Sequence, residues 1–182
     1  WSRLHLDFDS IGDELVSVSM VPDPFGNYDI AYLRESFRDL VIPFKQHYVV
    51  DMERSLDDMM SRHHKLAVRK AQRKIQTEVC PEPLEFLDEW IALHQNLVLK
   101  HSITGIRGFS RRAFEQQLKT PGIVVLLAKH NGETVGAQLW FQQQKVAFGH
   151  VLAFSDIGYK LGASYALYWF ALNYFSGKVR WC

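Results

Sequence analysis

A glycine turn ahead of an apolar helix pattern is the stretch of this sequence best suited to hold an anion. Residues 159–164 read YKLGAS, and a run of apolar and aromatic residues with helical spacing follows as far as Phe175. The first N–H groups of a helix have no partner within it and, with the helix dipole, attract negative charge. Glycine lets the backbone approach a phosphate closely. The turn therefore suits a phosphate or pyrophosphate, with an ordinary strand-to-helix loop as the alternative. The candidate cofactor-binding residues are Lys160, Gly162, Ala163 and Ser164.

Three side chains on the strand before this turn or beside the turn could transfer a proton. His150 is expected on a strand, and its neutral imidazole could act as a general base. Asp156 follows at the end of that strand and could be a base or orient a substrate, and Tyr159 could donate a proton. The alternatives are a hydrogen-bonded core histidine at His150 and an Asx turn at Asp156. Strand alternation is expected to place His150 on one face with Val146, Phe148, Leu152 and Phe154.

A basic segment, residues 62–74, packs six Lys or Arg and two His into 13 residues and contains no Asp or Glu. Helical spacing predicts an apolar stripe through His64, Val68, Ala71 and Ile75, and a basic row through Arg62, Lys65, Arg69 and Arg73. Such a row could bind a cofactor phosphate, a tRNA backbone, a nucleotide-linked sugar or an anionic glycan. A solvated helix face is the alternative. Arg69 and Lys70 are candidate substrate-binding residues.

The composition gives the chain no overall charge that would attract nucleic acid or a membrane. The 182 residues are 47% apolar and 23% charged, with a net charge of +1, so any electrostatic recognition is local. No aromatic residues interleave with the basic ones, which argues against DNA binding. Cys80 and Cys182 lie in no metal spacing and are expected to be reduced thiols of a cytoplasmic protein. No run is long enough for a membrane helix. The chain starts without Met and ends within a strand pattern, so we expect a fragment truncated at both ends.

Periodicity and turn residues predict the elements. Residues 131–132, Asn-Gly, are a strong hairpin signal, and Ser61 and Ser110 are expected helix caps. The order is an antiparallel meander followed by a βαβ crossover, which predicts an α/β fold with a mixed, mostly antiparallel sheet flanked by helices. Strands are predicted at 14–21, 44–52, 76–80, 123–130, 133–143, 145–154 and 178–182, and helices at 30–40, 55–75, 81–101, 111–120 and 162–175.

This order, together with the turn, resembles the core of the GNAT acyltransferases. The pyrophosphate turn of that family reads Arg/Gln-x-x-Gly-x-Gly/Ala; Gly162 matches it, whereas Tyr159 and Ser164 depart from it. Over residues 35–182 the chain looks most like the Fem-type branch, which includes peptidoglycan-bridge aminoacyl transferases and acetyltransferase-like proteins of polysaccharide biosynthesis. The stretches that carry this likeness are MSRHHKLAVRKAQR, NGETVGAQLW, HVLAFSDIGYKLGASYALYWFALNYF and VRWC. The resemblance implies one GNAT-like domain over residues 1–182.

The resemblance implies transfer of an acyl or aminoacyl group to an amine on a sugar or cell-envelope precursor. The donor would be acyl-CoA, such as acetyl-CoA, or aminoacyl-tRNA, with no metal. The loop after residue 101 could border the acceptor pocket, where His101 and Arg107 could bind a carboxylate or phosphate. Peripheral contact with a membrane is compatible with this role. A non-catalytic GNAT-shaped binding or assembly protein in polysaccharide biosynthesis is the alternative from another class.

Overall fold

The structure is a computed structural model that describes residues 3–11, 17–22, 25–43, 46–105 and 108–182. The chain divides into two compact units, Trp1–Tyr48 and Val49–Cys182. Every strand among the described residues, and all the candidate site residues, belong to the second unit. The single domain expected over residues 1–182 stays a prediction.

The first unit contains helices α1 (Leu4–Ile11) and α2 (Ile30–Ser36). The rings of Phe8 and Phe37 meet edge to face with centroids 5.0 Å apart. Asp29 caps α2 by accepting the N–H of Ala31 at 2.8 Å. Residues 17–21 contain no strand, so that part of the strand predicted over 14–21 is wrong, and residues 14–16 lie outside the described ones. Alternating apolar residues alone do not make a strand, since a strand needs a partner for its backbone.

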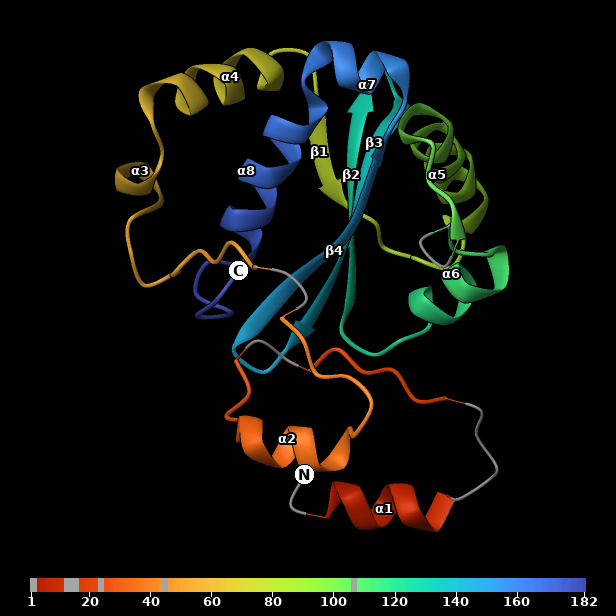
Figure 1. Ribbon diagram of the computed structural model, residues 1–182. Coiled ribbons are helices and arrows are strands. Elements are labelled where there is room, and N and C mark those ends of the chain that lie inside the picture. The colour runs from red at the N-terminus through yellow and green to blue at the C-terminus, as the bar shows by residue number, and fades with distance from the viewer. Residues whose placement is uncertain (1–2, 12–16, 23–24, 44–45, 106–107) are drawn as a thin grey trace. The chain divides into compact units, whose positions relative to one another are not determined.

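The second unit is built on a four-stranded antiparallel sheet in the order β1-β2-β3-β4 (Figure 1). The predicted Asn-Gly hairpin is confirmed: Asn131 and Gly132 both have positive φ, 52° and 85°, as a type I′ turn requires. The strands are β1 (Gln76–Val79), β2 (Ile123–His130), β3 (Glu133–Gln143) and β4 (Val146–Phe154).

Helices cover both faces of this sheet. α8 (Ala163–Phe175) lies on one face, and α5 (Leu87–His101) and α6 (Arg111–Leu118) lie on the other (Figure 1). We call the two cores the α8-face core and the α5-face core. The buried side chains of the α8-face core include Trp140, Phe154, Ala166, Leu167 and Phe175. Those of the α5-face core include Trp90, Leu93, Phe114, Val125 and Leu139.

The observed helices begin at their capping residues, even where the apolar periodicity begins earlier in the sequence. Ser61 accepts the N–H of His64 and begins α4 (Arg62–Gln72), so the helix predicted over 55–75 is split into α4 and the short α3 (Leu56–Met59). Ser110 caps α6 as predicted. The helix predicted from residue 81 begins only at Leu87, because the preceding residues form i to i+3 turns, such as Leu87 N–H to Leu84 C=O at 3.2 Å.

A crossover joins β4 to the last residues of the chain. After β4 come α7 (Asp156–Leu161) and α8, and Trp181 then forms a parallel bridge with Val146. Trp181 also forms an antiparallel bridge with Asp51. The strands predicted over 178–182 and 44–52 are therefore reduced to single bridges, with residues 44–45 outside the described ones. The predicted fold class, a mixed and mostly antiparallel sheet flanked by helices, is confirmed.

Candidate functional site

A β-bulge interrupts β4 at His150. Leu139 of β3 lies opposite Val151, but the next residue, Trp140, lies opposite Gly149. β4 thus has one residue more than β3 at this point, and that residue is His150. A bulge bends the strand and turns a side chain in a new direction, and bulges are frequent beside active sites.

The bulge changes which face His150 occupies. Its ring centroid lies 5.5 Å from those of both Phe109 and Phe141, whereas Leu152 and Phe154 pack in the α8-face core. The prediction that His150 shares a face with Leu152 and Phe154 is therefore wrong, because strict alternation fails across a bulge. The side chain is exposed, so the alternative of a core histidine is also wrong.

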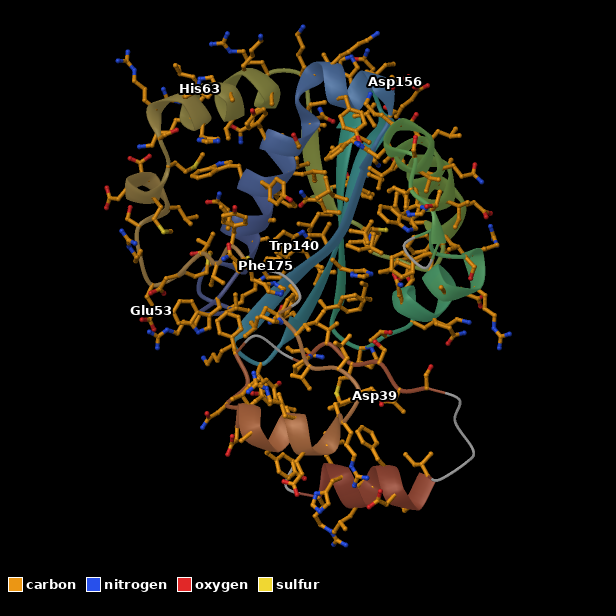
Figure 2. The ribbon with its side chains drawn as sticks, in the orientation of Figure 1. Asp39, Glu53, His63, Trp140, Asp156 and Phe175 are labelled. Atoms are coloured by element: carbon orange, nitrogen blue, oxygen red, sulfur yellow. The ribbon has the colours of Figure 1, made fainter. Side chains whose placement is uncertain are left out.

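Trp140 covers the other side of the bulge. A Cβ placed on Gly149 would lie only 3.2 Å from the Trp140 ring, so glycine allows the indole to rest on the strand. The indole Nε1–H donates to Gln138 Oε1 at 3.0 Å, and both side chains are buried. Figure 2 shows Trp140 and Phe175 close together beside α8, with ring centroids 5.3 Å apart. The bulge is thus backed by a fixed aromatic ring.

Two predicted catalytic residues, Asp156 and Tyr159, meet Lys100 at the end of β4. Lys100 Nζ lies 3.5 Å from Asp156 Oδ1 and 4.2 Å from the centroid of the Tyr159 ring. α7, whose first residue is Asp156, places both residues there, and Figure 2 shows Asp156 at the upper end of the sheet. The ion pair is exposed and contributes little to stability. Its effect is to hold a cation and a carboxylate beside a half-buried phenol.

The phenol of Tyr159 is protonated at neutral pH. Burial raises the pKa of Tyr159 above its ordinary value of 10.0, and the nearby Asp156 carboxylate raises the pKa further. Its ring also packs edge-on against Phe154, with centroids 5.4 Å apart. A phenol in this state can donate a proton to a leaving group.

The glycine turn is a corner between two helices. Gly162 has φ +69°, ends α7 and begins α8, so a helix that the sequence did not predict, α7, lies between β4 and the glycine turn. The cause is Ser155, whose hydroxyl accepts the N–H of Gly158 and starts α7 at the end of β4. The N–H of Gly162 donates to the carbonyl oxygens of Gly158 and Tyr159. Ala163 is fully buried, which leaves Lys160, Gly162 and Ser164 as the accessible members of the predicted phosphate set.

The remaining predicted residues are distributed over three places. Arg69 and Lys70 are exposed on α4, and α4 packs along α8 through the predicted stripe that contains Val68 and Ala71. His101 is exposed at the end of α5, next to Lys100. Arg107 lies outside the described residues. The structure therefore brings together Asp156, Tyr159 and the end of α5, and does not place Arg69 or Lys70 with them.

Three residues of this region escaped the sequence patterns. Lys100 looks like an ordinary basic residue of a helix end. Asn96, one turn earlier, donates to the carbonyl oxygen of Phe154 at 2.6 Å and ties α5 to the end of β4. Gly158 carries a detectable signal, a glycine inside a helix pattern: a Cβ there would lie 2.1 Å from Val135 O, so only glycine lets α7 approach β3 this closely.

Within the described residues, no group of three or more His, Cys, Asp or Glu side chains is arranged to hold a metal ion. None of the described helices combines the length and apolar character that crossing a membrane requires.

No model of a protein family matches the chain, and none of the curated proteins matches it. Solved structures do. FemX superposes with a TM-score of 0.62 at 9% identity, over 73% of this chain and 50% of that one. The C-terminal domain of a putative lysylphosphatidylglycerol synthetase from Agrobacterium fabrum gives a TM-score of 0.58 at 14% identity, over 73% and 43%. L-PGS from Bacillus licheniformis gives 0.57 at 15% identity, over 73% and 43%.

These likenesses establish the fold. The chain has a GNAT-like fold. The structural match to FemX confirms the predicted resemblance to the Fem-type branch in the fold alone. The chain spans half or less of the length of each of these structures.

Proposed function

We propose that this chain is an N-acyltransferase domain that moves an acyl group to an amine on a sugar or cell-envelope precursor. The observation that carries the proposal is the bulge at His150, on β4, the last strand of a GNAT-like sheet, which leads into the α7 residues Asp156 and Tyr159. Among the described residues, one parallel bridge lies on the outer edge of β4, and it joins Val146 to Trp181. A donor lying along that edge would have its carbonyl beside backbone N–H groups of the strand, which stabilise a developing oxyanion.

The proposed step uses each group once. The amine nitrogen attacks the carbonyl carbon of a thioester donor, and the imidazole of His150 accepts the amine proton. The bond from carbon to sulfur breaks, and the Tyr159 phenol gives its proton to the leaving sulfur. Asp156, held by Lys100, orients the acceptor amine. Lys160 and Ser164 are the residues we propose for the donor phosphates.

Titration of the full chain with CoA, together with turnover of acetyl-CoA with glucosamine, tests the proposal. We expect saturable CoA binding that His150→Gln leaves unchanged. Turnover should fall by about 10²- to 10⁴-fold in His150→Gln, the usual contribution of a general base. His63→Gln, an exposed histidine on α4, is the matched control and should keep its turnover. Equal turnover in both variants would remove His150 from the reaction.

The donor is decided by a second arm of the same experiment. If CoA does not bind and charged tRNA binds with a steep salt dependence, the donor is aminoacyl-tRNA. The cations of α4 would then contact the tRNA backbone. The leaving group would then be a ribose oxygen in place of sulfur. If neither donor binds, both proposed donors are excluded and the alternative of a non-catalytic GNAT-shaped protein gains.

A further inference from the structure

The outer edge of β4 is closed at its beginning by the last residues of the chain. The N–H of Ala147 donates to the carbonyl oxygen of Trp181 at 2.8 Å, and the N–H of Arg180 donates to that of Lys145 at 2.8 Å. In an antiparallel strand, backbone groups that point away from the partner strand recur at every second residue. The next outward groups therefore belong to Gly149, which stands directly before the bulge.

Asn96 of α5 closes the same edge at its other end. The N–H of Ser155 donates to the carbonyl oxygen of Val135 at 3.0 Å, which makes Gly136 and Phe154 a pair without mutual backbone hydrogen bonds. The carbonyl of Phe154 therefore points away from β3, and the side-chain amide of Asn96 donates to it at 2.6 Å. The bulge in β4 lies between these two closed ends.

One peptide unit at the end of β4 is thus held from both sides. The carbonyl of Phe154 and the N–H of Ser155 belong to the same planar unit, so neither can turn without the other. β3 holds the N–H through Val135, and α5 holds the carbonyl through Asn96. Asn96 is half-buried, so water competes little for this hydrogen bond.

The direction of this peptide unit decides where the Tyr159 phenol lies. Ser155 begins α7 by accepting the N–H of Gly158, so the helix starts from the unit that Asn96 holds. The Phe154 ring is 1% exposed and packs edge-on against the Tyr159 ring. Both the backbone and the ring contact therefore transmit a rotation of the unit to Tyr159.

α5 contacts this connection at a second point. Lys100 is four residues after Asn96, so both side chains lie on the same side of α5. Lys100 reaches Asp156 and the Tyr159 ring on α7. Figure 1 shows α5 beside the end of β4 from which α7 starts. The ammonium group is exposed, whereas the amide is half-buried, so the hydrogen bond of Asn96 is the better shielded of the two contacts.

We propose that Asn96 is the positioning residue of Tyr159: it fixes the peptide unit from which α7 starts and so directs the phenol towards the leaving group. The inference rests on the proposed transfer step, in which Tyr159 protonates that group. Asn96 does not touch the reacting atoms and acts through Phe154 and α7. A misplacement of about 1 Å can lower the rate of an enzyme about 100-fold, so one amide at the start of a short helix is sufficient.

Turnover of acetyl-CoA with glucosamine by the full chain, measured in two backgrounds, tests this role. Asn96→Leu should lower kcat by about 10- to 100-fold and leave the affinity for CoA unchanged. In a Tyr159→Phe chain, which has already lost the proton donor, Asn96→Leu should lower kcat by at most about twofold more. A side chain that only stabilises the fold would instead lower kcat equally in both backgrounds.

A second measurement needs neither donor nor acceptor. The full chain is labelled with tyrosine carrying ¹³C at Cζ, and the NMR signal of Tyr159 is identified by its loss in Tyr159→Phe. Burial raises the pKa of Tyr159 above 10.0, and a loosened α7 would admit water to the phenol. In Asn96→Leu we therefore expect the signal to shift at neutral pH and its titration midpoint to fall towards 10.0.

The next residue of α5 supplies the matched control. Gln95 is exposed, and Gln95→Leu removes an amide in the same way as Asn96→Leu, so it should keep both the turnover and the Tyr159 signal of the native chain. Asn96→Ala removes the amide without adding an apolar group and should behave like Asn96→Leu. Thermal unfolding verifies that each variant is folded.

The two measurements separate a failure of Asn96 from a failure of the proposed function. An equal loss of kcat in both backgrounds would overturn the positioning role and leave the transfer reaction standing. A native chain without turnover would count against the proposed function, and the NMR signal would then decide the role of Asn96. A Tyr159 signal that Asn96→Leu leaves unmoved overturns the role in either case, whereas a shift that Gln95→Leu does not produce supports it.

Discussion

α8 packs on its face of the sheet through small residues, whereas α5 and α6 fill the opposite face with large rings. Ala163, Ala166 and Ala171 of α8 are at most 1% exposed. On the other face, the Phe114 ring meets those of Trp90 and His94, with centroids 5.5 and 4.6 Å away. Small residues allow close approach of backbone, and large rings fill a wider space. Added volume is therefore expected to cost stability beside these alanines of α8, and lost volume is expected to cost stability beside these rings of the α5 face.

Each face also buries one polar side chain, and the two are satisfied differently. Gln138, 1% exposed in the α8-face core, accepts the Trp140 indole N–H, although its own Nε2 has no partner in the described structure. His94, 5% exposed in the α5-face core, is surrounded by the rings of Trp90 and Phe114. An amide does not titrate near neutral pH, but an imidazole does. The pH dependence of stability should therefore originate from the α5 face.

The largest effect is expected from a cavity in the α5-face core. Phe114→Ala should lower the free energy of unfolding by about 3 to 5 kcal/mol, because Phe114 is fully buried and the surrounding rings cannot close the space. Urea unfolding measures the loss. Phe170→Ala on the half-buried side of α8 is the comparison and should cost less. An equal loss in both variants would contradict the deeper burial of Phe114.

A smaller loss is expected from added volume on the α7 and α8 side. Gly158→Ala should cost about 1 to 3 kcal/mol, because its Cβ would lie 2.1 Å from Val135 O and α7 would have to move. The same unfolding measurement applies. Gly108→Ala is the control, since a Cβ there would stay 3.4 Å from Gly105 O. If both variants unfold like the native chain, α7 is not held as closely to β3 as the structure indicates.

The smallest effect is a pH dependence that His94 should produce. Burial lowers the pKa of His94 below its ordinary value of 6.5. The unfolded chain therefore binds a proton at His94 more readily than the folded chain does. The stability that comes from keeping this imidazole neutral is complete above pH 6.5 and is lost as the pH falls towards the lower pKa of the folded state. The slope for one proton is at most about 1.4 kcal/mol per pH unit. Unfolding between neutral and mildly acidic pH should show a shallower slope in His94→Leu, and an unchanged slope would exclude His94 as the source.

Local chemistry was enough to predict the caps, the hairpin and the helix of the crossover. Ser61, Ser110 and the turn at Asn131 act on backbone groups within a few residues, so their effect can be recognised without knowing the fold. The same holds for the stripe of α4, in which Val68 and Ala71 are buried as their spacing predicted, although His64 is exposed. The start of α5 was misplaced because its apolar periodicity extends into residues that form only turns.

The sequence by itself determined the class of fold and the residues that stand near the end of β4. The tertiary structure decided the arrangement of the site. Whether β4 bulges at His150 depends on its pairing with β3, and the approach of Lys100 to Asp156 and Tyr159 depends on how α5 lies across the sheet. These contacts join segments distant in sequence, whose energies no local pattern records.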